Sequence, residues 1–393
     1  MSNMLEDIIA TKSERLLNKK IALCITGSIA AVECVRLARE LIRYGAEVRA
    51  YLTPSVGEII TPRAIEFATG TAPVTEITGR VEHLEKFDLV LIAPASANTI
   101  SKIAHGIADT PVTLLALSSQ AELLIAPAMH RSMLTNAVIR KNIEKLKELG
   151  ITFISPEEEE GAGKLASIEE IVDYTIKLLT PPILAGKKVV VTGGATIEDI
   201  DDVRVITNRS SGKMGIALAK EAFYLGARVV LIHGRVTESL PVYIETIKSE
   251  RIDEMLKAVE NEAKDTDILI SAAAIGDFTV KKFKGKLDSR KDKLILELTP
   301  SPKILALIKS FSCFKVGFKA LPEGDDMKLI EASRNILKEH SLDLVIANDI
   351  TMAAGSNENE VIIISENEVL KLPRASKAKI SSSIFKEILK RFS

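Results

Sequence analysis

The chain has 393 residues, of which 46% are hydrophobic and 27% are charged, and its formal net charge is -1 at pH 7. This length exceeds what one hydrophobic core usually serves, so the sequence predicts two domains. The balanced charge argues against a nucleic-acid partner, and no apolar run is long enough to span a membrane. Three cysteines without a CxxC pair indicate neither a disulfide framework nor a thiolate zinc site, so we expect a cytoplasmic protein.

In the first half of the chain, short β-rich runs alternate with helical patterns. This alternation is typical of a parallel sheet with crossover helices. We predict strands over residues 20–26, 47–52, 88–93, 112–117, 123–126 and 151–154, and helices over 29–43, 140–149 and 168–179.

Thr180-Pro181-Pro182 interrupts this pattern, because proline cannot continue a helix. We therefore place a linker at residues 180–186, between one domain over residues 1–180 and another over residues 187–393. In the second domain we predict strands over 187–192, 228–232, 267–272, 315–318 and 344–347, helices over 213–225 and 376–391, and an edge hairpin of 361–365 with 368–372. The halves share no residue-level repeat, so the predicted fold class is α/β with two different Rossmann-like three-layer domains.

Three predicted strands of the first domain run into turns of small and polar residues. These turns are TGSIA at residues 26–30, APASANT at residues 93–99 and APAMH at residues 126–130. Ligands of open α/β sheets bind beyond the carboxyl ends of the strands, where backbone N–H groups at a helix start donate hydrogen bonds to phosphate. Each turn also has a structural explanation, namely close packing at Gly27, a helix cap at Ser96 or Asn98, and core filling by Met129.

Together these turns resemble the homo-oligomeric flavin-containing cysteine decarboxylases, specifically the phosphopantothenoylcysteine decarboxylase domain, over residues 20–175. The resemblance implies a flavodoxin-like domain that binds FMN between the subunits of a trimer. The residues that it places near FMN are Gly27, Ser28, Thr53, Ser96, Asn98, Thr99 and Met129.

His83 occupies the position of the family's catalytic histidine, although a surface histidine is more often incidental. The resemblance implies that it transfers a proton while the flavin oxidises the cysteine thiol, which allows loss of CO2 to an enethiolate that is then reduced. His130 stands where the family has an asparagine that holds the substrate carboxylate, and an imidazole can donate a hydrogen bond to that carboxylate.

The family's flap carries a cysteine that protonates the enethiolate, and this chain has none there. The corresponding run, EEEEGAGKLA at residues 157–166, keeps Gly161, Gly163 and a basic Lys164. The nearest acids are Glu157 to Glu160, which also read as a solvated loop. If no group protonates the intermediate, this half would release an enethiol instead of the reduced product.

In the second domain, VTGGAT at residues 191–196 is another strand-to-loop turn suited to phosphate. It is followed by NRSSGKMG at residues 208–215, which lacks the spacing of a Walker A loop. We expect Ser210 or Ser211 to cap the helix that follows.

The sequence TNRSSGKMG, with AAAIGDF, GFKA and AND further on, resembles phosphopantothenate–cysteine ligase over residues 186–390. The resemblance implies a dimeric Rossmann-like ligase domain that uses CTP and Mg²⁺ to form an acyl-cytidylate, which the cysteine amine then attacks. With a trimeric flavin domain, it implies a larger homo-oligomer, up to a dodecamer. It assigns catalysis to Asn208 and Lys286, nucleotide or substrate binding to Ser210, Ser211, Lys213, Asp277, Phe318 and Asn348, and a Mg²⁺ contact to Asp277. The structural alternatives are a loop cap for Asp277 and a mobile basic loop for the segment around Lys286.

Three alternatives stay open at this stage. A flavin-binding regulatory subunit is disfavoured by the ligase-like half, and a NAD(P)-dependent oxidoreductase is disfavoured by the missing GxGxxG turn with its acidic partner. The third alternative keeps an active ligase beside an impaired flavin domain.

Overall fold

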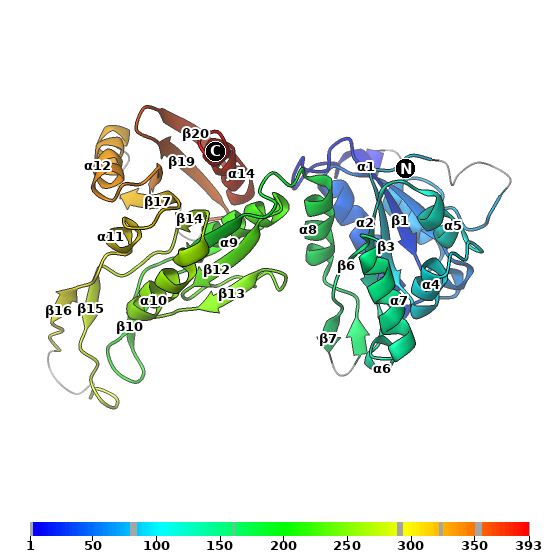
Figure 1. The fold of residues 1–393 in the computed structure, drawn as a ribbon, viewed down its shortest axis with the longest axis horizontal. Coiled ribbons are helices and arrows are strands. Elements are labelled where there is room, and N and C mark those ends of the chain that lie inside the picture. Colours follow the sequence, from blue (N-terminus) through cyan, green and yellow to red (C-terminus); the bar gives the residue numbers. More distant parts are fainter. Residues whose placement is uncertain are drawn as a thin grey trace. The chain divides into compact units, whose positions relative to one another are not determined.

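The computed structural model describes residues 3–78, 85–159, 162–288, 294–321, 325–349 and 356–392. The chain divides into two compact units, Met1–Pro181 and Pro182–Ser393 (Figure 1). Each unit has its own parallel sheet with helices on both faces, as the α/β prediction required. In the part of the chain that the structure describes, no helix is long and apolar enough to cross a membrane.

Unit 1 is built on a five-stranded sheet in the order β2-β1-β3-β4-β6, in which every pair is parallel. This order is that of flavodoxin-like folds, and it reverses direction between β1 and β3. The strands are β1 (Lys20–Ile25), β2 (Glu47–Leu52), β3 (Leu89–Ala95), β4 (Glu122–Pro127) and β6 (Thr152–Phe153). The helices are α1 (Asn3–Glu6), α2 (Cys34–Arg43), α3 (Pro62–Thr69), α4 (Ala97–Ala104), α5 (Pro111–Ser118), α6 (Arg131–Leu134), α7 (Ala137–Glu148) and α8 (Ile168–Leu179).

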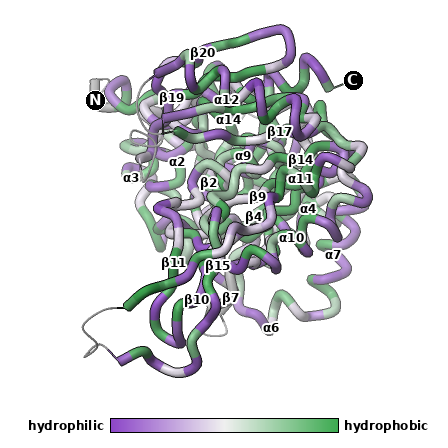
Figure 2. The backbone as a smooth tube through the Cα atoms, turned by 90° about the vertical axis from the view of Figure 1, so that its left-hand side faces the viewer, coloured by the Kyte–Doolittle hydropathy of each residue, from purple (hydrophilic) through white to green (hydrophobic). Residues whose placement is uncertain are grey.

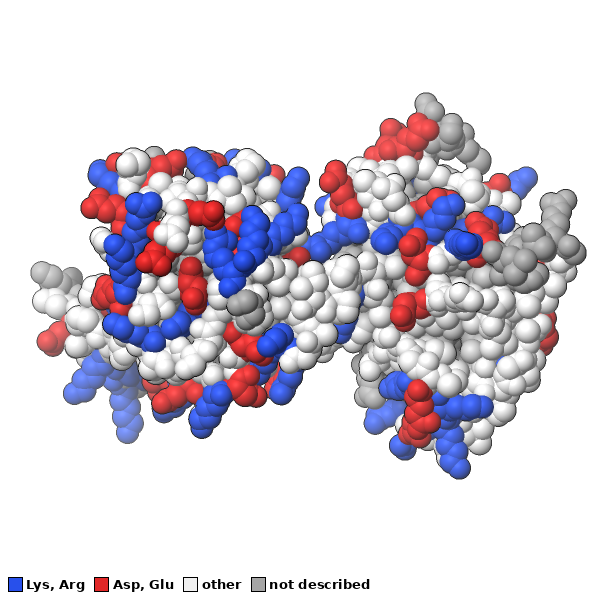
Figure 3. All heavy atoms as spheres, turned by 45° about the horizontal axis from the view of Figure 1, so that its top comes forward, with Lys and Arg blue, Asp and Glu red and all other residues white. Residues whose placement is uncertain are grey.

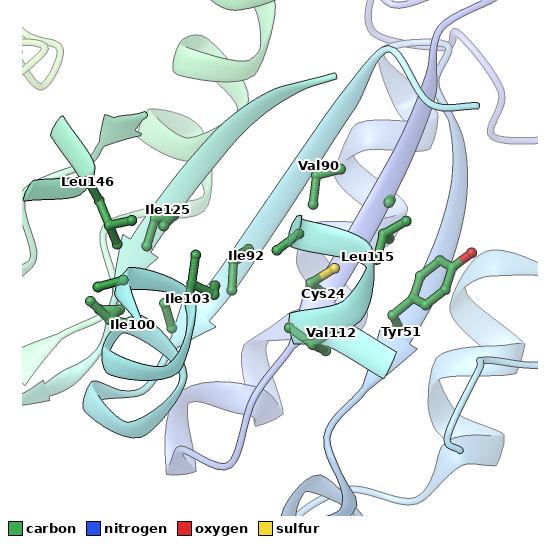
Figure 4. Packing of buried hydrophobic residues seen from close by; sticks show 14 of the residues in the cluster. Cys24, Tyr51, Val90, Ile92, Ile100, Ile103, Val112, Leu115, Ile125 and Leu146 are labelled. Carbon is green, nitrogen blue, oxygen red and sulfur yellow. The ribbon is translucent and has the colours of Figure 1, made fainter. Parts of the chain in front are cut away.

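One hydrophobic cluster of unit 1 lies between the sheet and helices α4, α5 and α7 (Figure 4). Tyr51, Val90 and Ile92 from the strands pack against Ile100 of α4 and Leu115 of α5, and all of them are almost fully buried. β3 is buried along its whole length, as expected for a central parallel strand covered on both faces.

The strand predicted over residues 112–117 is wrong, because this segment forms helix α5. Thr110 caps the helix in a reciprocal capping box with Thr113, and Pro111 occupies its first turn, where no backbone N–H is needed. Most of the helix surface is buried, so it lacks the polar face that identifies a helix in a sequence. The helix predicted over residues 29–43 begins as a 3-10 helix, η1 (Ile29–Glu33), before α2.

A second, three-stranded sheet extends from the end of β4. It contains β5 (Met129–His130), β7 (Glu157–Glu159) and β8 (Ala162–Lys164), all antiparallel. The glutamate-rich run of the expected flap is thereby joined through β8 to the strand that carries Met129 and His130.

Unit 2 has an eight-stranded sheet in the order β13-β12-β9-β14-β17-β18-β19-β20. The first six strands are parallel, and the hairpin of β19 and β20 is antiparallel at the edge, which confirms the predicted hairpin. Its strands are β9 (Lys188–Gly193), β12 (Arg228–His233), β13 (Glu245–Lys248), β14 (Ile268–Ser271), β17 (Phe314–Leu321), β18 (Leu344–Asp349), β19 (Glu358–Ile364) and β20 (Val369–Ser376). The direction of crossover reverses between β9 and β14.

Helices α9 (Lys213–Tyr224) and α14 (Lys377–Leu389) pack together on this sheet. Helices α10 (Ile252–Glu262), α11 (Ile304–Ile308) and α12 (Asp326–Glu339) join the apolar core of the sheet. Helix α9 approaches β9 so closely that a Cβ on Gly215 would lie 2.8 Å from the Cα of Gly193. Only glycine at both positions permits this packing.

Two short antiparallel ribbons lie beside each other at one end of unit 2 (Figures 1 and 2). The first pairs β10 (Ile197–Asp199) with β11 (Val205–Thr207), and the second pairs β15 (Phe278–Val280) with β16 (Leu298–Pro300). The sequence analysis did not predict these ribbons. They expose apolar side chains, among them Val203 and Phe278.

The outer strand β20 carries Lys371, Pro373 and Arg374. Lys371 pairs with Asp326 and Glu360, and Arg374 pairs with Glu358. On the face shown in Figure 3, acidic and basic side chains are interspersed, as the balanced composition predicts.

Candidate active sites

The turns after β1 and β3 meet at the switch point of the unit 1 sheet. Thr26 connects them, because its hydroxyl donates to the Pro94 carbonyl at 2.8 Å and accepts the Ser96 N–H at 2.8 Å. Gly27 lies against the loop after β2, where an added Cβ would come within 2.2 Å of the Ser55 hydroxyl oxygen. Thr53, in the same loop, is buried beside Ser55, with 3.4 Å between the hydroxyl oxygens.

Ser96 caps helix α4, as one of the structural explanations predicted. Its Oγ accepts the Thr99 N–H at 3.3 Å and lies 3.1 Å from the Thr99 hydroxyl. Thr99 is buried, whereas Asn98 is exposed at the sheet edge. Of these three predicted cofactor contacts, Asn98 is the side chain most accessible to a ligand.

A pocket of about 830 Å³ opens beside Ser28 and the start of the small sheet. Ser28 Oγ donates to the Ala128 carbonyl at 3.3 Å, which joins the turn after β1 to the turn after β4. A volume of this size is in the usual range for cofactor sites. The lining includes Ser28, Ile29, Ala30, Val32, Arg36, Met129, His130 and Lys164. Glu33, Ser167 and Glu169 also line it, so the pocket combines apolar surface with two hydroxyls, an imidazole, two cations and two carboxylates. One of the cations, Arg36, pairs with Glu33 at 3.1 Å.

His130 is exposed at the pocket and has a defined hydrogen-bonding state. Its Nδ1 accepts the Ser132 N–H at 3.3 Å and lies 2.8 Å from the Ser132 hydroxyl. Because a backbone N–H can only donate, Nδ1 carries no proton, and the neutral ring holds its proton on Nε2. Nε2–H is thus the donor that His130 can offer a carboxylate.

His83 lies outside the described residues, as do Glu160 and Gly161. The backbone of Glu157–Glu159 forms β7, two strands from His130 in the small sheet. Burial raises the pKa of the thiols of Cys24 and Cys34, and neither residue lines the pocket.

In unit 2, Asn208 lies at the switch point between β9 and β14. Its Nδ2 donates to the carbonyls of Ala274 at 3.2 Å and Ile275 at 3.1 Å. Ala274 pairs in turn with Ala195 in the turn after β9. The structure therefore brings together the VTGGAT, NRSSGKMG and AAAIGDF segments that the sequence analysis singled out.

The expected serine cap of helix α9 is wrong. Gly212 takes the cap position with φ of 78°, a conformation that glycine adopts without strain, and no side chain caps the helix. Ser210 Oγ instead accepts the Gly212 N–H at 3.4 Å, and the Ser211 carbonyl accepts the Thr237 N–H at 3.2 Å. Both serines remain beside the turn that starts α9.

The other predicted residues of unit 2 are spread along the carboxyl edge of its sheet. Lys213 Nζ donates to Asn357 at 2.6 Å and pairs with Glu238 at 3.3 Å. Asp277 is paired with Lys303 and is largely exposed. Lys286 is exposed in the loop after β15, and Phe318 lies on β17.

Asn348 lies on β18 and lines a separate pocket of about 470 Å³. Charged residues of both signs surround it, including Asp349, Lys371 and Arg374. Among the described residues, no group of three or more His, Cys, Asp or Glu side chains could hold a metal ion. Any Mg²⁺ at Asp277 would therefore take most of its ligands from water and phosphate oxygens.

Sequence reasoning missed Asp201 and Arg204, which link the Asn208 ribbon to the Lys286 loop. The Asp201 side chain is fully buried and pairs with Arg204 at 2.7 Å. Its Oδ1 accepts the backbone N–H groups of Val203 and Arg204, which makes an Asx turn. An aspartate two residues before a Val-Arg pair is compatible with such a turn, but nothing in the sequence shows the contact with the distant loop.

Two open α/β sheets, each with small and polar turns at its switch point, define a two-domain α/β protein with a candidate phosphate-binding turn in each half. Residues 9–180 match the family model described as Flavoprotein, and residues 184–392 match that of the DNA/pantothenate metabolism flavoprotein C-terminal domain. The chain is 49% identical to the "Coenzyme A biosynthesis bifunctional protein CoaBC" of Thermococcus kodakarensis over 98% of each chain. It is 43% identical to the CoaBC protein of Methanocaldococcus jannaschii, over 97% of this chain and 96% of that one. The chain belongs to this CoaBC family of bifunctional coenzyme A biosynthesis proteins.

Among solved structures, the C-terminal domain of a CoaBC protein is similar to unit 2. It is 30% identical, with a TM-score of 0.45, and the match covers 53% of this chain and 96% of that one.

Proposed function

We propose that the chain carries out two consecutive steps of coenzyme A biosynthesis. Residues 187–393 join 4'-phosphopantothenate to cysteine with CTP, and residues 1–180 decarboxylate the resulting 4'-phosphopantothenoylcysteine to 4'-phosphopantetheine. The observation that carries this proposal is the presence of both family halves in one chain, each with its motifs gathered at a sheet switch point. A flavin-binding regulatory subunit or a NAD(P)-dependent oxidoreductase would not need the candidate ligase site in residues 187–393.

For the first unit, we propose FMN as the cofactor. The pocket beside Ser28 and Met129 supports this proposal, because its apolar lining suits a flavin ring and its Ser28 turn and Lys164 offer hydrogen-bond donors to a phosphate, although Glu33 and Glu169 also line it. The flavin supplies the reversible oxidation that turns the cysteine side chain into an electron sink. Of the predicted cofactor residues, Ser28 and Met129 line this pocket. The others do not line it, and we propose that they complete the cofactor site from the turns after β1, β2 and β3: Gly27, Thr53, Ser96, Asn98 and Thr99.

The proposed roles of the two histidines in this unit differ. His130 Nε2–H donates to the substrate carboxylate and orients the bond that breaks. His83 exchanges the proton of the substrate thiol. The CO2 that leaves carries no proton, so one proton must return to the carbon from an acid of the flap region.

A second outcome for this unit rests on the flap. The run at residues 157–166 has no cysteine, so an enethiol could leave before it is reduced. Product mass distinguishes the two outcomes, because the enethiol is lighter than 4'-phosphopantetheine by two hydrogens.

For the second unit, we propose that the substrate carboxylate attacks the α-phosphorus of CTP and that pyrophosphate leaves. The cysteine amine then attacks the acyl carbon, and CMP leaves. Lys286 offsets the negative charge that builds on the phosphate during the first attack. Asn208 donates a hydrogen bond to the mixed anhydride, for which its Nδ2 group releases one of the two backbone carbonyls that it binds here. Asp277 contacts Mg²⁺. Ser210, Ser211, Lys213, Phe318 and Asn348 bind nucleotide or substrate.

We also propose that the chain forms a homo-oligomer. In it the flavin domains associate as trimers and the ligase domains as dimers, in an assembly of up to twelve copies. The exposed apolar residues on the ribbons of unit 2 and beside the flavin pocket, such as Val203, Phe278 and Ile29, support such contacts. Three unpaired cysteines fit the reducing cytoplasm.

The test uses the full chain with phosphopantothenate, cysteine, CTP and Mg²⁺, followed by mass analysis of the products. We expect His83→Asn to stop at 4'-phosphopantothenoylcysteine and Lys286→Gln to form little of it. Full 4'-phosphopantetheine formation by His83→Asn would remove that residue from the mechanism, and no pyrophosphate from the wild type would refute the ligase.

A further inference from the structure

Asp201 is a fully buried acid at the tip of the β10–β11 ribbon, and it binds a loop 86 residues away in sequence. Its Oδ2 accepts the Leu287 N–H at 3.0 Å and the Arg204 guanidinium at 2.7 Å. The same guanidinium reaches the Leu287 carbonyl at 3.4 Å. Both polar groups of the Leu287 backbone are thus bound by one ion pair.

Further contacts hold the residues just before Leu287. The Gly285 N–H donates to Asp202 Oδ2 at 3.1 Å, and the Phe283 N–H donates to the Ile200 carbonyl at 2.9 Å. Lys282 pairs with Asp202 at 3.2 Å and with Asp199 at 3.4 Å. We name this set of contacts between residues 199–204 and 282–287 the ribbon clasp.

Lys286 lies between the two clasped backbone amides, those of Gly285 and Leu287. Its own side chain is exposed, so the clasp fixes the backbone and leaves the ammonium group accessible. Without such contacts a basic surface loop would sample many conformations. The entropy lost when the loop becomes ordered would then offset part of the stabilisation that the lysine gives the transition state.

The ribbon also leads directly to Asn208. Thr207, the last residue of β11, donates its hydroxyl to the Thr196 carbonyl at 2.8 Å, and Asn208 binds the carbonyls after β14. One short ribbon therefore connects the loop of the proposed activating lysine with the residue proposed to hold the anhydride.

We propose that Asp201 is a positioning residue of the ligase, which through the ribbon clasp holds Lys286 where the α-phosphate of the nucleotide reacts. This inference rests on the proposed function of Lys286. The Asp201 carboxylate is suited to the role because hydrogen bonds from Leu287 and its own turn lower its pKa to about 2, so it stays an acceptor at neutral pH.

The test compares Asp201→Asn with the wild type in the full chain. Asparagine has one acceptor oxygen, which can keep the Asx turn to Val203 and Arg204, while its NH2 group meets the Leu287 N–H and cannot accept it. We expect pyrophosphate release to slow by about 10- to 100-fold, as for a misplaced catalytic group. Trypsin cleavage after Lys284 and Lys286 should become faster.

Asp202→Ala is the second variant, because Asp202 is exposed and its loss leaves the core intact. It removes the acceptor for Gly285, and we expect pyrophosphate release to slow by about 3- to 10-fold, the effect of one hydrogen bond. Glu260→Gln, at an exposed acid of α10 outside the clasp, is the matched control and should retain the wild-type rate.

The Lys286→Gln background separates positioning from general stability. If Asp201 acts through Lys286, adding Asp201→Asn to Lys286→Gln should slow the reaction less than about twofold, whereas a purely structural effect would be additive. Decarboxylation of added 4'-phosphopantothenoylcysteine reports the other unit and should be unchanged. Full pyrophosphate release and unchanged trypsin protection in Asp201→Asn would overturn the inference. An inactive wild type would instead refute the proposed function, and the cleavage assay would still test the clasp.

Discussion

Replacing His130 by alanine tests the proposed orientation of the substrate carboxylate. In the structure the Ser132 N–H occupies Nδ1, so the ring has one donor, Nε2–H, for the substrate. A hydrogen bond to a charged group contributes about 1.5–3 kcal/mol. Since about 1.4 kcal/mol corresponds to a tenfold change in rate, His130→Ala should lower kcat/KM for decarboxylation by about 10- to 150-fold.

The assay follows CO2 release from synthetic 4'-phosphopantothenoylcysteine, which bypasses the ligase. His130→Asn restores an amide donor and should recover most of the rate. His105→Ala is the control, because His105 is an exposed histidine at the end of α4 whose Nδ1 lies 2.8 Å from the Ser101 carbonyl. A His130→Ala enzyme with the wild-type kcat/KM would refute the reasoning.

Three further predictions concern glycines and one acid. Gly27→Ala would place a Cβ 2.2 Å from the Ser55 hydroxyl, so FMN binding measured by fluorescence should weaken, and adding Ser55→Gly should restore it. Gly234→Ala would place a Cβ 2.2 Å from the Ala195 carbonyl oxygen. This overpacking should cost roughly 1–3 kcal/mol and lower the melting temperature of unit 2 by about 2–12 °C in circular dichroism, and an unchanged melt would contradict it. The pKa of Asp201 is lowered from 3.8 to about 2, so its stabilisation is present above about pH 4 and disappears as the pH falls toward 2. Acid unfolding should therefore be less steep over that range in Asp201→Asn, and equal slopes would exclude this linkage.

Most of the two sheets could be predicted, because parallel strands such as β3 and β9 are continuous apolar runs between helical patterns. The segment at 112–117 was misassigned since a buried helix and a buried strand have the same apolar composition. The sequence signal for a helix at this position is Thr110 as an N-cap followed by Pro111 in the first turn. The ribbons around residues 200 and 279 escaped prediction because strands of three residues are too short to show a period.

For the sites, sequence motifs indicated which turns carry polar groups, and the parallel topology explains why those turns meet. The motifs could not show which polar side-chain atoms already form hydrogen bonds or ion pairs within the protein. Lys213 reads as a phosphate ligand but is bound to Asn357, 144 residues further on. Asp201 is the opposite case, a residue that no motif singles out. Its proposed role depends on a hydrogen bond from the Leu287 N–H, which lies too far along the chain for a local pattern to predict.

The charged outer strand β20 also limits how copies of the chain can meet. An exposed strand is a template on which identical chains can add strand by strand and grow into fibres. Pro373 offers no N–H to such a neighbour, and the ion-paired side chains of Lys371 and Arg374 place charged groups along that edge. Strand addition at that border of the sheet is therefore disfavoured.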